Sequence, residues 1–469
     1  MKDRNTIIKL LKVLSLIILY YISSKTSMFI YLTTLVLYNI YTSSFKHIKL
    51  KEKLKKIDNN NQKINLLKYT SISICIITLI FMLLSLLISE SINIFLNINK
   101  TLLPFLVMSI CVITNPIINL IIEYLESINK TKIATRLYYT YHLIELILFL
   151  LISVITLVFT KLPIHIISML LYIPKIISFI CVSLIFYLII LKNQLKEDKE
   201  ETKIEYIKEV KNILKNNIHN SMISVCKHGF FYISIIVLYL VLSTRYSYDI
   251  NEIENDIVFI YLYGINVINL TIEITLKYIE EKNNNIIMQI IEVFKYLFTN
   301  AIIITITAPL ICKLIFNQSS NSIYIAMLGF LSIFIALFKK TFKHIKNKKI
   351  VYISLLVGIF SKMILIVPLI NSFYRMGYNL IYGDIASTII SMFLSITINY
   401  IYLQNKYKKE KILEKILTTL YENMILCILL IITQFIIPIK TENYIITLLI
   451  FLVYITISLM FFKMKKKRG

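Results

Sequence analysis

The chain has 469 residues, of which 57% are hydrophobic and only 16% are charged. Soluble domains are about 25% charged, whereas this chain repeats apolar stretches of roughly 20 residues, the length that crosses a bilayer. The composition excludes a soluble globular domain, a disordered protein and a disulfide scaffold, and it predicts an all-α polytopic membrane protein. The net charge of +25 does not indicate nucleic-acid binding, because the cations lie in short loops between apolar stretches.

Fourteen apolar segments are predicted to cross the membrane as helices. They are 7–24, 28–46, 69–89, 102–122, 137–160, 164–191, 218–243, 257–278, 293–316, 323–338, 350–370, 380–403, 420–439 and 444–462. The first of them resembles a signal peptide, but no small-residue cleavage site follows it. We therefore expect it to remain as a membrane span.

The basic residues between these segments predict the orientation of the chain. Every second loop carries a single Lys or Arg: Lys25, Lys100, Lys161, Arg245, Lys313, Arg375 and Lys440. The other loops and both ends hold nearly all the remaining cations. Since positively charged loops stay in the cytoplasm, the pattern predicts a multi-pass protein of the cell membrane with both termini in the cytoplasm.

An internal repeat divides the first twelve segments into two sets of six. Asn59–Asn61 corresponds to Asn283–Asn285, and Leu191–Glu197 after the sixth segment corresponds to Leu403–Glu410 after the twelfth. Because six is an even number, both sets cross the membrane in the same sense, as in parallel-repeat transporters with a central cavity. We expect an N-terminal six-helix lobe, a cytoplasmic amphipathic linker, a second six-helix lobe, and two added helices with a basic tail. Their bounds are 1–195, 196–217, 218–405 and 406–469.

Several short motifs lie at the ends of the predicted spans. They are Pro116-Ile-Ile-Asn119, Glu123-Tyr-Leu-Glu126, Asn129–Ala134, Thr307-Ala-Pro-Leu310, Tyr382–Thr388 and Asn399-Tyr-Ile-Tyr-Leu403. With these motifs the chain resembles the multidrug/oligosaccharidyl-lipid/polysaccharide (MOP) exporter superfamily, and within it the polysaccharide-biosynthesis and lipid II flippase-like branch. The resemblance implies two six-helix lobes plus two C-terminal helices, and transport by alternating access.

Three lysines are predicted to lie near the middle of the bilayer, where an ionisable group is costly unless it faces a cavity or a partner. They are Lys175, Lys227 and Lys362, and His228 adjoins Lys227. We expect these four residues to bind the phosphates of a lipid-linked substrate, since an ammonium group is a strong phosphate partner in a low dielectric. The alternative is that each lysine pairs with a buried acid, such as Asp384, Glu145 or Glu273.

Asp384 and Glu273 are the candidates for coupling to a cation or a proton. The alternative is that they are ordinary carboxylates at helix ends. Glu145 lies close to His142 in the fifth segment. An acid in an otherwise apolar cavity of the first lobe favours a cation-coupled multidrug antiporter, whereas a cationic cavity favours a flippase.

Tyrosines near span ends are expected to anchor the chain at the membrane interface, because Trp is absent. They are Tyr20, Tyr21, Tyr138, Tyr139, Tyr400 and Tyr402. Stacking against a carbohydrate is the alternative. The chain has only 7 Gly and no phosphate-binding loop, metalloprotease motif or nucleophile elbow. We therefore expect a protein that is not an enzyme and needs no cofactor or metal.

The function predicted from the sequence is a flippase or exporter that moves a polyprenyl-pyrophosphate-linked oligosaccharide or cell-wall precursor across the cytoplasmic membrane. The expected partners are this lipid-linked glycan, membrane lipids and glycan-synthesis enzymes, with no nucleic acid. One alternative is a cation-coupled multidrug antiporter of the same superfamily. Another is a non-transporting membrane scaffold derived from a flippase, since the first span lacks the Gly and Arg residues usual in the family.

Overall fold

The computed structural model describes residues 25–45, 48, 50–57, 59–96, 101–158, 162–188, 200–246, 250–282, 286–316, 322–345, 347–406, 412–437 and 444–468, although not every side chain within them. The predicted first span, 7–24, lies outside the described residues. The chain forms two compact units, Met1–Val258 and Phe259–Gly469. Within the described ranges all regular structure is helical, because a segment in lipid must satisfy its backbone hydrogen bonds internally.

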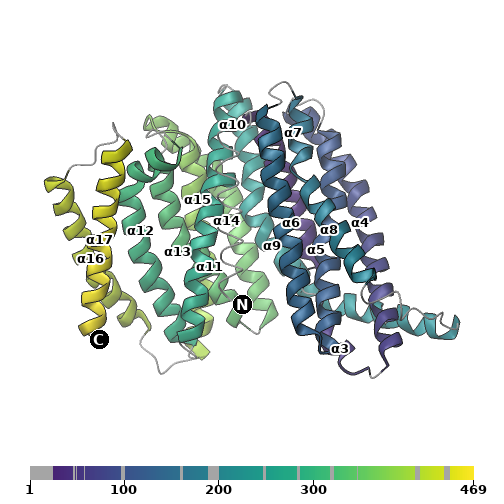
Figure 1. Cartoon of the computed structure of the whole chain (residues 1–469). Helices are drawn as coiled ribbons and strands as arrows, with labels where there is room; N and C mark the ends of the chain where they lie inside the picture. Colours follow the sequence, from purple (N-terminus) through teal and green to yellow (C-terminus); the bar gives the residue numbers. More distant parts are fainter. Residues whose placement is uncertain are drawn as a thin grey trace. The chain divides into compact units, whose positions relative to one another are not determined.

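The first unit consists of helices joined by short loops (Figure 1). They are α2 (Lys25–Phe45), α3 (Lys51–Leu54), α4 (Asn60–Leu96), α5 (Leu102–Ser127), α6 (Thr131–Val158), α7 (Ile164–Leu170), α8 (Ile173–Phe186), α9 (Glu200–Arg245) and α10 (Ile250–Val258). The predicted sixth span is broken into α7 and α8 by a turn at 171–172. Pro174 lies in the first turn of α8, where the missing amide hydrogen costs no helical bond.

The second unit begins with a π-helical turn, η2 (Phe259–Gly264), which leads directly into α11. The helices that follow are α11 (Ile265–Lys282), α12 (Ile286–Phe316), α13 (Ser322–His344), α14 (Lys348–Arg375), α15 (Ile381–Lys406), α16 (Ile412–Ile436) and α17 (Tyr444–Arg468). π-helical turns are rare and occur frequently at functional sites. The one at Phe259–Gly264 lies inside the predicted eighth span.

Eight helical segments among the described residues are long and apolar enough to cross a membrane. Two shorter apolar segments, Asn423–Gln434 and Ile445–Ser458, add to them in α16 and α17. The exposed side of α4 illustrates the lipid-facing surface, since Leu79, Leu83 and Leu87 recur at helical spacing and are all more than half exposed. The predicted all-α polytopic membrane fold is confirmed, and these helices are compatible with about fourteen spans.

Helix α9 runs without a break from Glu200 to Arg245. It therefore joins most of the predicted linker to the predicted seventh span in one helix. On its amphipathic part, Tyr206 and Val210 are buried while Lys208 is exposed. The ring of Tyr206 stacks on that of Tyr69 of α4, with 5.6 Å between the ring centroids. Tyr206 and Val210 thus pack on the protein, whereas Ile207 of the same helix is 58% exposed. The predicted division of the chain into lobes stays a prediction.

The two C-terminal helices pack on α12 in the second unit (Figure 1). Their shared core comprises Ile302 and Leu310 of α12, Leu426 and Leu430 of α16, and Ile450 and Tyr454 of α17. One buried polar contact crosses this core, because the Thr299 hydroxyl donates to Asn423 Oδ1 at 2.6 Å. The added helices are therefore an integral part of the second unit.

Candidate functional site

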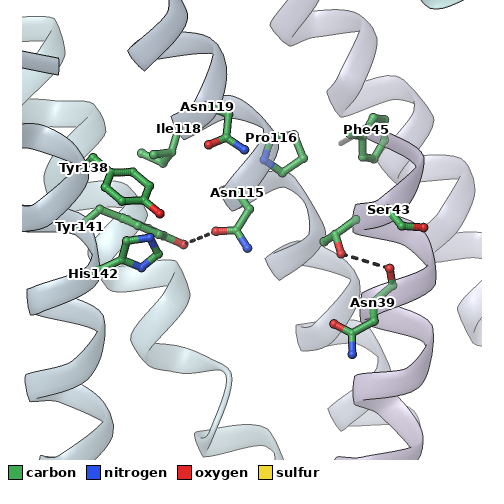
Figure 2. Close-up of a pocket in the computed structure, with 11 residues that line it drawn as sticks. Asn39, Ser43, Phe45, Asn115, Pro116, Ile118, Asn119, Tyr138, Tyr141 and His142 are labelled. Atoms are coloured by element: carbon green, nitrogen blue, oxygen red, sulfur yellow. Dashed lines mark hydrogen bonds between the residues drawn. The ribbon is translucent and has the colours of Figure 1, made fainter. Parts of the chain in front are cut away.

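A polar pocket of about 310 Å³ lies among α2, α5 and α6 of the first unit (Figure 2). Its lining residues are Asn39, Thr42, Ser43 and Phe45 of α2, Asn115, Pro116, Ile118 and Asn119 of α5, and Tyr138, Tyr141 and His142 of α6. Most of these side chains carry an amide, a hydroxyl or a ring nitrogen, and none is a Lys or Arg. The volume is at the lower end of the range for ligand sites, about 300–1,000 Å³.

Asn115 connects the walls of this pocket. Its Nδ2 donates to the Tyr38 hydroxyl of α2 at 2.7 Å, and its Oδ1 accepts from the Tyr141 hydroxyl of α6 at 3.1 Å. Figure 2 shows Asn115 pointing from α5 toward Tyr141. Because Pro116 has no amide hydrogen, the helix lacks one backbone bond at this level. The amide of Asn115 therefore holds three helices together where α5 is weakened.

Lys175 lies at the edge of the same hydrogen-bond network. Its ammonium group is 3.9 Å from the centre of the Tyr38 ring and 5.6 Å from the centre of the Tyr172 ring. A cation over an aromatic face is stabilised by the ring quadrupole, more strongly where water is excluded. The Tyr172 hydroxyl lies 2.9 Å from the Thr34 hydroxyl, which fixes this second ring. Lys175 is thus held by one ring of α2 and by one ring of the turn that precedes its own helix, α8.

An acid lies next to the pocket wall. Glu145 of α6 is only 7% exposed, and its Oε2 is 3.1 Å from Nδ1 of His142. The two residues are one helical turn apart, so their side chains lie on the same face of α6. The predicted proximity of His142 and Glu145 is therefore confirmed, and it places a buried carboxyl group beside the imidazole that lines the pocket.

A second pocket, of about 240 Å³, adjoins the first and shares Phe45, Pro116 and Asn119 with it. Glu123 and Glu126 of α5 line it. Glu123 Oε2 accepts hydrogen bonds from the backbone amides of Leu50 and Lys51, at 2.6 and 2.9 Å. The carboxylate thereby caps the start of α3. The motif residues on which the family resemblance rests in this helix thus line both pockets.

In the second unit, the structure brings together two residues that were predicted to act separately. Nζ of Lys362 on α14 is 3.8 Å from Oδ1 of Asp384 on α15. Lys362 is 6% exposed and Asp384 is 0% exposed. The hydroxyl of Tyr261, from the π-helical turn, donates to Asp384 Oδ2. For Lys362 the structure therefore agrees with the alternative of pairing with a buried acid.

The other predicted site residues are Lys227, His228 and Glu273. Lys227 and His228 lie on α9, and their side chains lie outside the described residues. Glu273 lies on α11 and is exposed. The assignment of substrate-binding and ion-coupling roles to these residues stays a prediction.

The sequence did not identify Tyr38, Asn115, Tyr141 or Tyr261 as site residues. Asn115 and Asn119 are four residues apart, and Tyr138, Tyr141 and His142 recur at helical spacing, so each set occupies one helix face. A polar helix face within an apolar span was the feature of the sequence that could have indicated these site residues. Tyr261 had no such signal, because its position depends on the π-helical turn.

No protein-family model and no curated protein matches the chain in sequence. Solved structures do match its fold. "Lipid II flippase MurJ, inward closed conformation" has a TM-score of 0.67 at 15% identity, over 100% of this chain and 98% of that one. An inward-facing multidrug resistance MATE family transporter of the MOP superfamily has a TM-score of 0.55 at 12% identity, over 86% of this chain and 99% of that one.

A third structure is a MOP superfamily transporter from Pyrococcus furiosus, described as having a binding pocket of reverse polarity. Its TM-score is 0.54 at 11% identity, over 86% of this chain and 93% of that one. The similarity spans nearly the whole length of each protein, although so little sequence identity carries information about the fold alone. The chain is therefore a multi-pass membrane protein with the fold of the MOP superfamily transporters, as its sequence motifs implied.

Proposed function

We propose that the protein is a flippase or exporter for a polyprenyl-pyrophosphate-linked oligosaccharide or cell-wall precursor. It would act by alternating access in the cytoplasmic membrane, driven by the membrane potential or an ion gradient. On this proposal it is not an enzyme, and glycan-synthesis enzymes supply its substrate.

The observation that carries the proposal is the polar pocket of the first unit together with Lys175. Amide and hydroxyl groups such as those of Asn39, Asn115 and Asn119 donate and accept hydrogen bonds, which suits the hydroxyl groups of a sugar. Lys175 is linked to the pocket through Tyr38 and Asn115 and supplies a positive charge for a phosphate. A headgroup with both sugar and phosphate matches this combination.

The test uses the full chain in proteoliposomes with a fluorescent polyprenyl-diphosphate disaccharide. We expect the wild-type protein to move the lipid between leaflets, and Lys175→Ala to reduce its affinity about tenfold or more, the value of one charge-assisted hydrogen bond. Lys175→Arg keeps the charge and should retain most of the binding. Lys132→Ala, at an exposed position at the start of α6, is the matched control.

Two results would contradict this proposal. Equal binding by the wild-type protein and Lys175→Ala would remove Lys175 from the substrate site. Vesicles in which no lipid-linked sugar moves would reject the flippase and leave the antiporter and the membrane scaffold as alternatives.

A cation-coupled multidrug antiporter is the second candidate, and Glu145 favours it. This buried acid is paired with His142 on the pocket wall, and a carboxylate of this kind exchanges protons or binds cationic compounds. Uptake of an organic cation that depends on a proton or Na⁺ gradient, and that is lost in Glu145→Gln, would support the antiporter. Lipid-linked sugar transport that is unaffected by Glu145→Gln would support the flippase.

A further inference from the structure

Lys362 and Asp384 form an ion pair that is nearly removed from solvent. The two groups are 6% and 0% exposed, and Nζ lies 3.8 Å from Oδ1. A single buried charge in a membrane span costs several kcal/mol, on the order of 2.5–3.5 by biological scales. Each group therefore needs the other, and the site as a whole is electrically neutral.

The surroundings of Asp384 resemble a cation site more than an ordinary ion pair. Tyr261 donates its hydroxyl hydrogen to Oδ2. Within the described part of the chain, Oδ1 accepts no hydrogen bond, and the ammonium group at 3.8 Å is beyond hydrogen-bond range. One carboxylate oxygen thus faces a positive charge without a hydrogen bond, and the Tyr261 hydroxyl is a further oxygen beside the carboxylate.

The backbone around Asp384 is fixed by local contacts. The hydroxyls of Ser387 and Thr388 both donate to its carbonyl oxygen, at 2.7 and 2.8 Å. Gly383 packs so closely on α14 that an added Cβ would lie 2.5 Å from the backbone nitrogen of Ile370. Tyr261 in turn depends on the π-helical turn for its direction. The carboxylate is therefore held in place before any cation arrives.

We propose that Asp384 and Tyr261 form a monovalent-cation site, and that the tethered ammonium of Lys362 occupies it permanently. A lysine ammonium has the charge of Na⁺ or K⁺ and, like them, seeks oxygen ligands. Because this cation is covalently attached, Asp384 needs no free ion. On this proposal Asp384 does not couple transport to an ion, in contrast to the role predicted from the sequence. The inference does not depend on the proposed transport function.

The test measures the thermal unfolding midpoint of the purified full chain in detergent. Chloride salts of Na⁺, K⁺, Li⁺ and N-methylglucamine are compared at one ionic strength. The wild-type protein should unfold at the same temperature in all four salts. Lys362→Ala should be destabilised in N-methylglucamine by several degrees and recover, saturably, when Na⁺ or K⁺ is added. The double variant Lys362→Ala, Asp384→Asn should show no such recovery.

Lys340→Ala is the matched control. Lys340 is also almost fully buried in the second unit and pairs with Glu280 at 2.9 Å, but Glu280 is 36% exposed. Water can therefore solvate Glu280 after the lysine is removed, and we expect no specific recovery by Na⁺ or K⁺. Recovery equal to that of Lys362→Ala would overturn the proposal, because it would show a general salt effect.

Two further outcomes decide the matter. Saturable stabilisation of the wild-type protein by Na⁺ or K⁺ that disappears in Asp384→Asn would show that a free ion binds beside Lys362, and the proposal would be wrong.

Lys362→Gln, which retains most of the side-chain volume, serves as the second variant in the same salt series. If both variants fold only with Na⁺ or K⁺ present, the proposal is supported; if neither folds in any salt, it is rejected.

Discussion

Tyr38 has two separate interactions, one through its ring and one through its hydroxyl. The ring face lies under the ammonium group of Lys175, and the hydroxyl accepts from Asn115. A cation–π contact away from water contributes about 2 kcal/mol, and a hydrogen bond between membrane helices about 0.6 kcal/mol on average. The two contributions are separable, because phenylalanine has the ring and lacks the hydroxyl.

We expect Tyr38→Phe to lower the free energy of unfolding by about 1 kcal/mol and Tyr38→Leu to lower it by roughly 2–3 kcal/mol. Thermal or denaturant unfolding in detergent measures both. Thr42→Ala, one turn further along α2, is the control, since its hydroxyl bonds only the preceding turn of its own helix among the contacts described. Equal losses from Phe and Leu would show that the ring of Tyr38 contributes nothing to holding Lys175.

Two glycines of the second unit are needed for different physical reasons. Gly377 has φ +73° and open space around its missing Cβ, whereas Gly383 meets the α14 backbone at 2.5–2.8 Å. Asparagine tolerates the left-handed region, so Gly377→Asn should cost less than about 1 kcal/mol. Gly383→Asn should cost more than Gly383→Ala, itself about 1–3 kcal/mol, because α14 and α15 must separate. Unfolding midpoints of the three variants test this, and a Gly383→Asn variant that loses no more stability than Gly377→Asn would contradict it.

At the scale of elements, helix type and position follow from the sequence, while breaks and joins do not. Apolar stretches of about 20 residues can only be helices in lipid. Within the described residues, the predicted spans from 28–46 onward lie almost entirely in helices, with the turn at 171–172 as the main interruption. The continuous α9 was missed because its first half is amphipathic and its second half is apolar. This change of pattern led to the prediction of two separate elements, a linker and a span. The π-helical turn at Phe259–Gly264 was missed because one extra residue in a helix leaves the hydrophobic pattern almost unchanged.

The packing of α16 on α12 gives a prediction at this scale. Asn423 is fully buried and accepts a hydrogen bond from Thr299 at 2.6 Å. We expect Asn423→Leu to lower stability by about 0.6 kcal/mol, the average for hydrogen bonds between membrane helices, and by no more than about 1.7 kcal/mol. Thr433→Val, whose hydroxyl bonds Leu429 of its own helix, serves as the comparison. Unfolding that is insensitive to Asn423→Leu would mean that apolar packing alone holds α16.

At the scale of the whole molecule, the orientation in the membrane rests on loop charge. The loop at 376–380 follows Arg375 and is predicted to lie outside, whereas Lys130, in the loop between α5 and α6, is predicted to lie inside. Single cysteines placed at Tyr378 and at Lys130, in a chain whose six native cysteines are replaced, would be labelled from opposite sides by an impermeant thiol reagent. We expect labelling of position 378 in intact cells and of position 130 only after permeabilisation.

The candidate site was less predictable than the fold. Position within the predicted spans drew attention to Lys175 and Lys362, because an apolar span offers few other polar groups. In the structure Lys175 is partly buried and Lys362 is buried, while their predicted binding roles stay predictions. Their partners come from helices distant in sequence: Tyr38 lies on α2, and Asp384 lies on α15. Span order alone does not say which faces of two helices meet, so the sequence left both possibilities open for each lysine.

The pairing of Lys362 with Asp384 has a consequence for biosynthesis. Lys362 stands near the middle of α14, so this helix emerging alone from the ribosome would enter the translocon at a cost of about 3 kcal/mol for its charge. The compensating carboxylate follows after a turn of five residues, 376–380, at the start of α15. The two helices therefore partition into the bilayer most favourably as one neutral hairpin, and a nascent chain that stops at Arg375 should be integrated less efficiently than one that continues through α15.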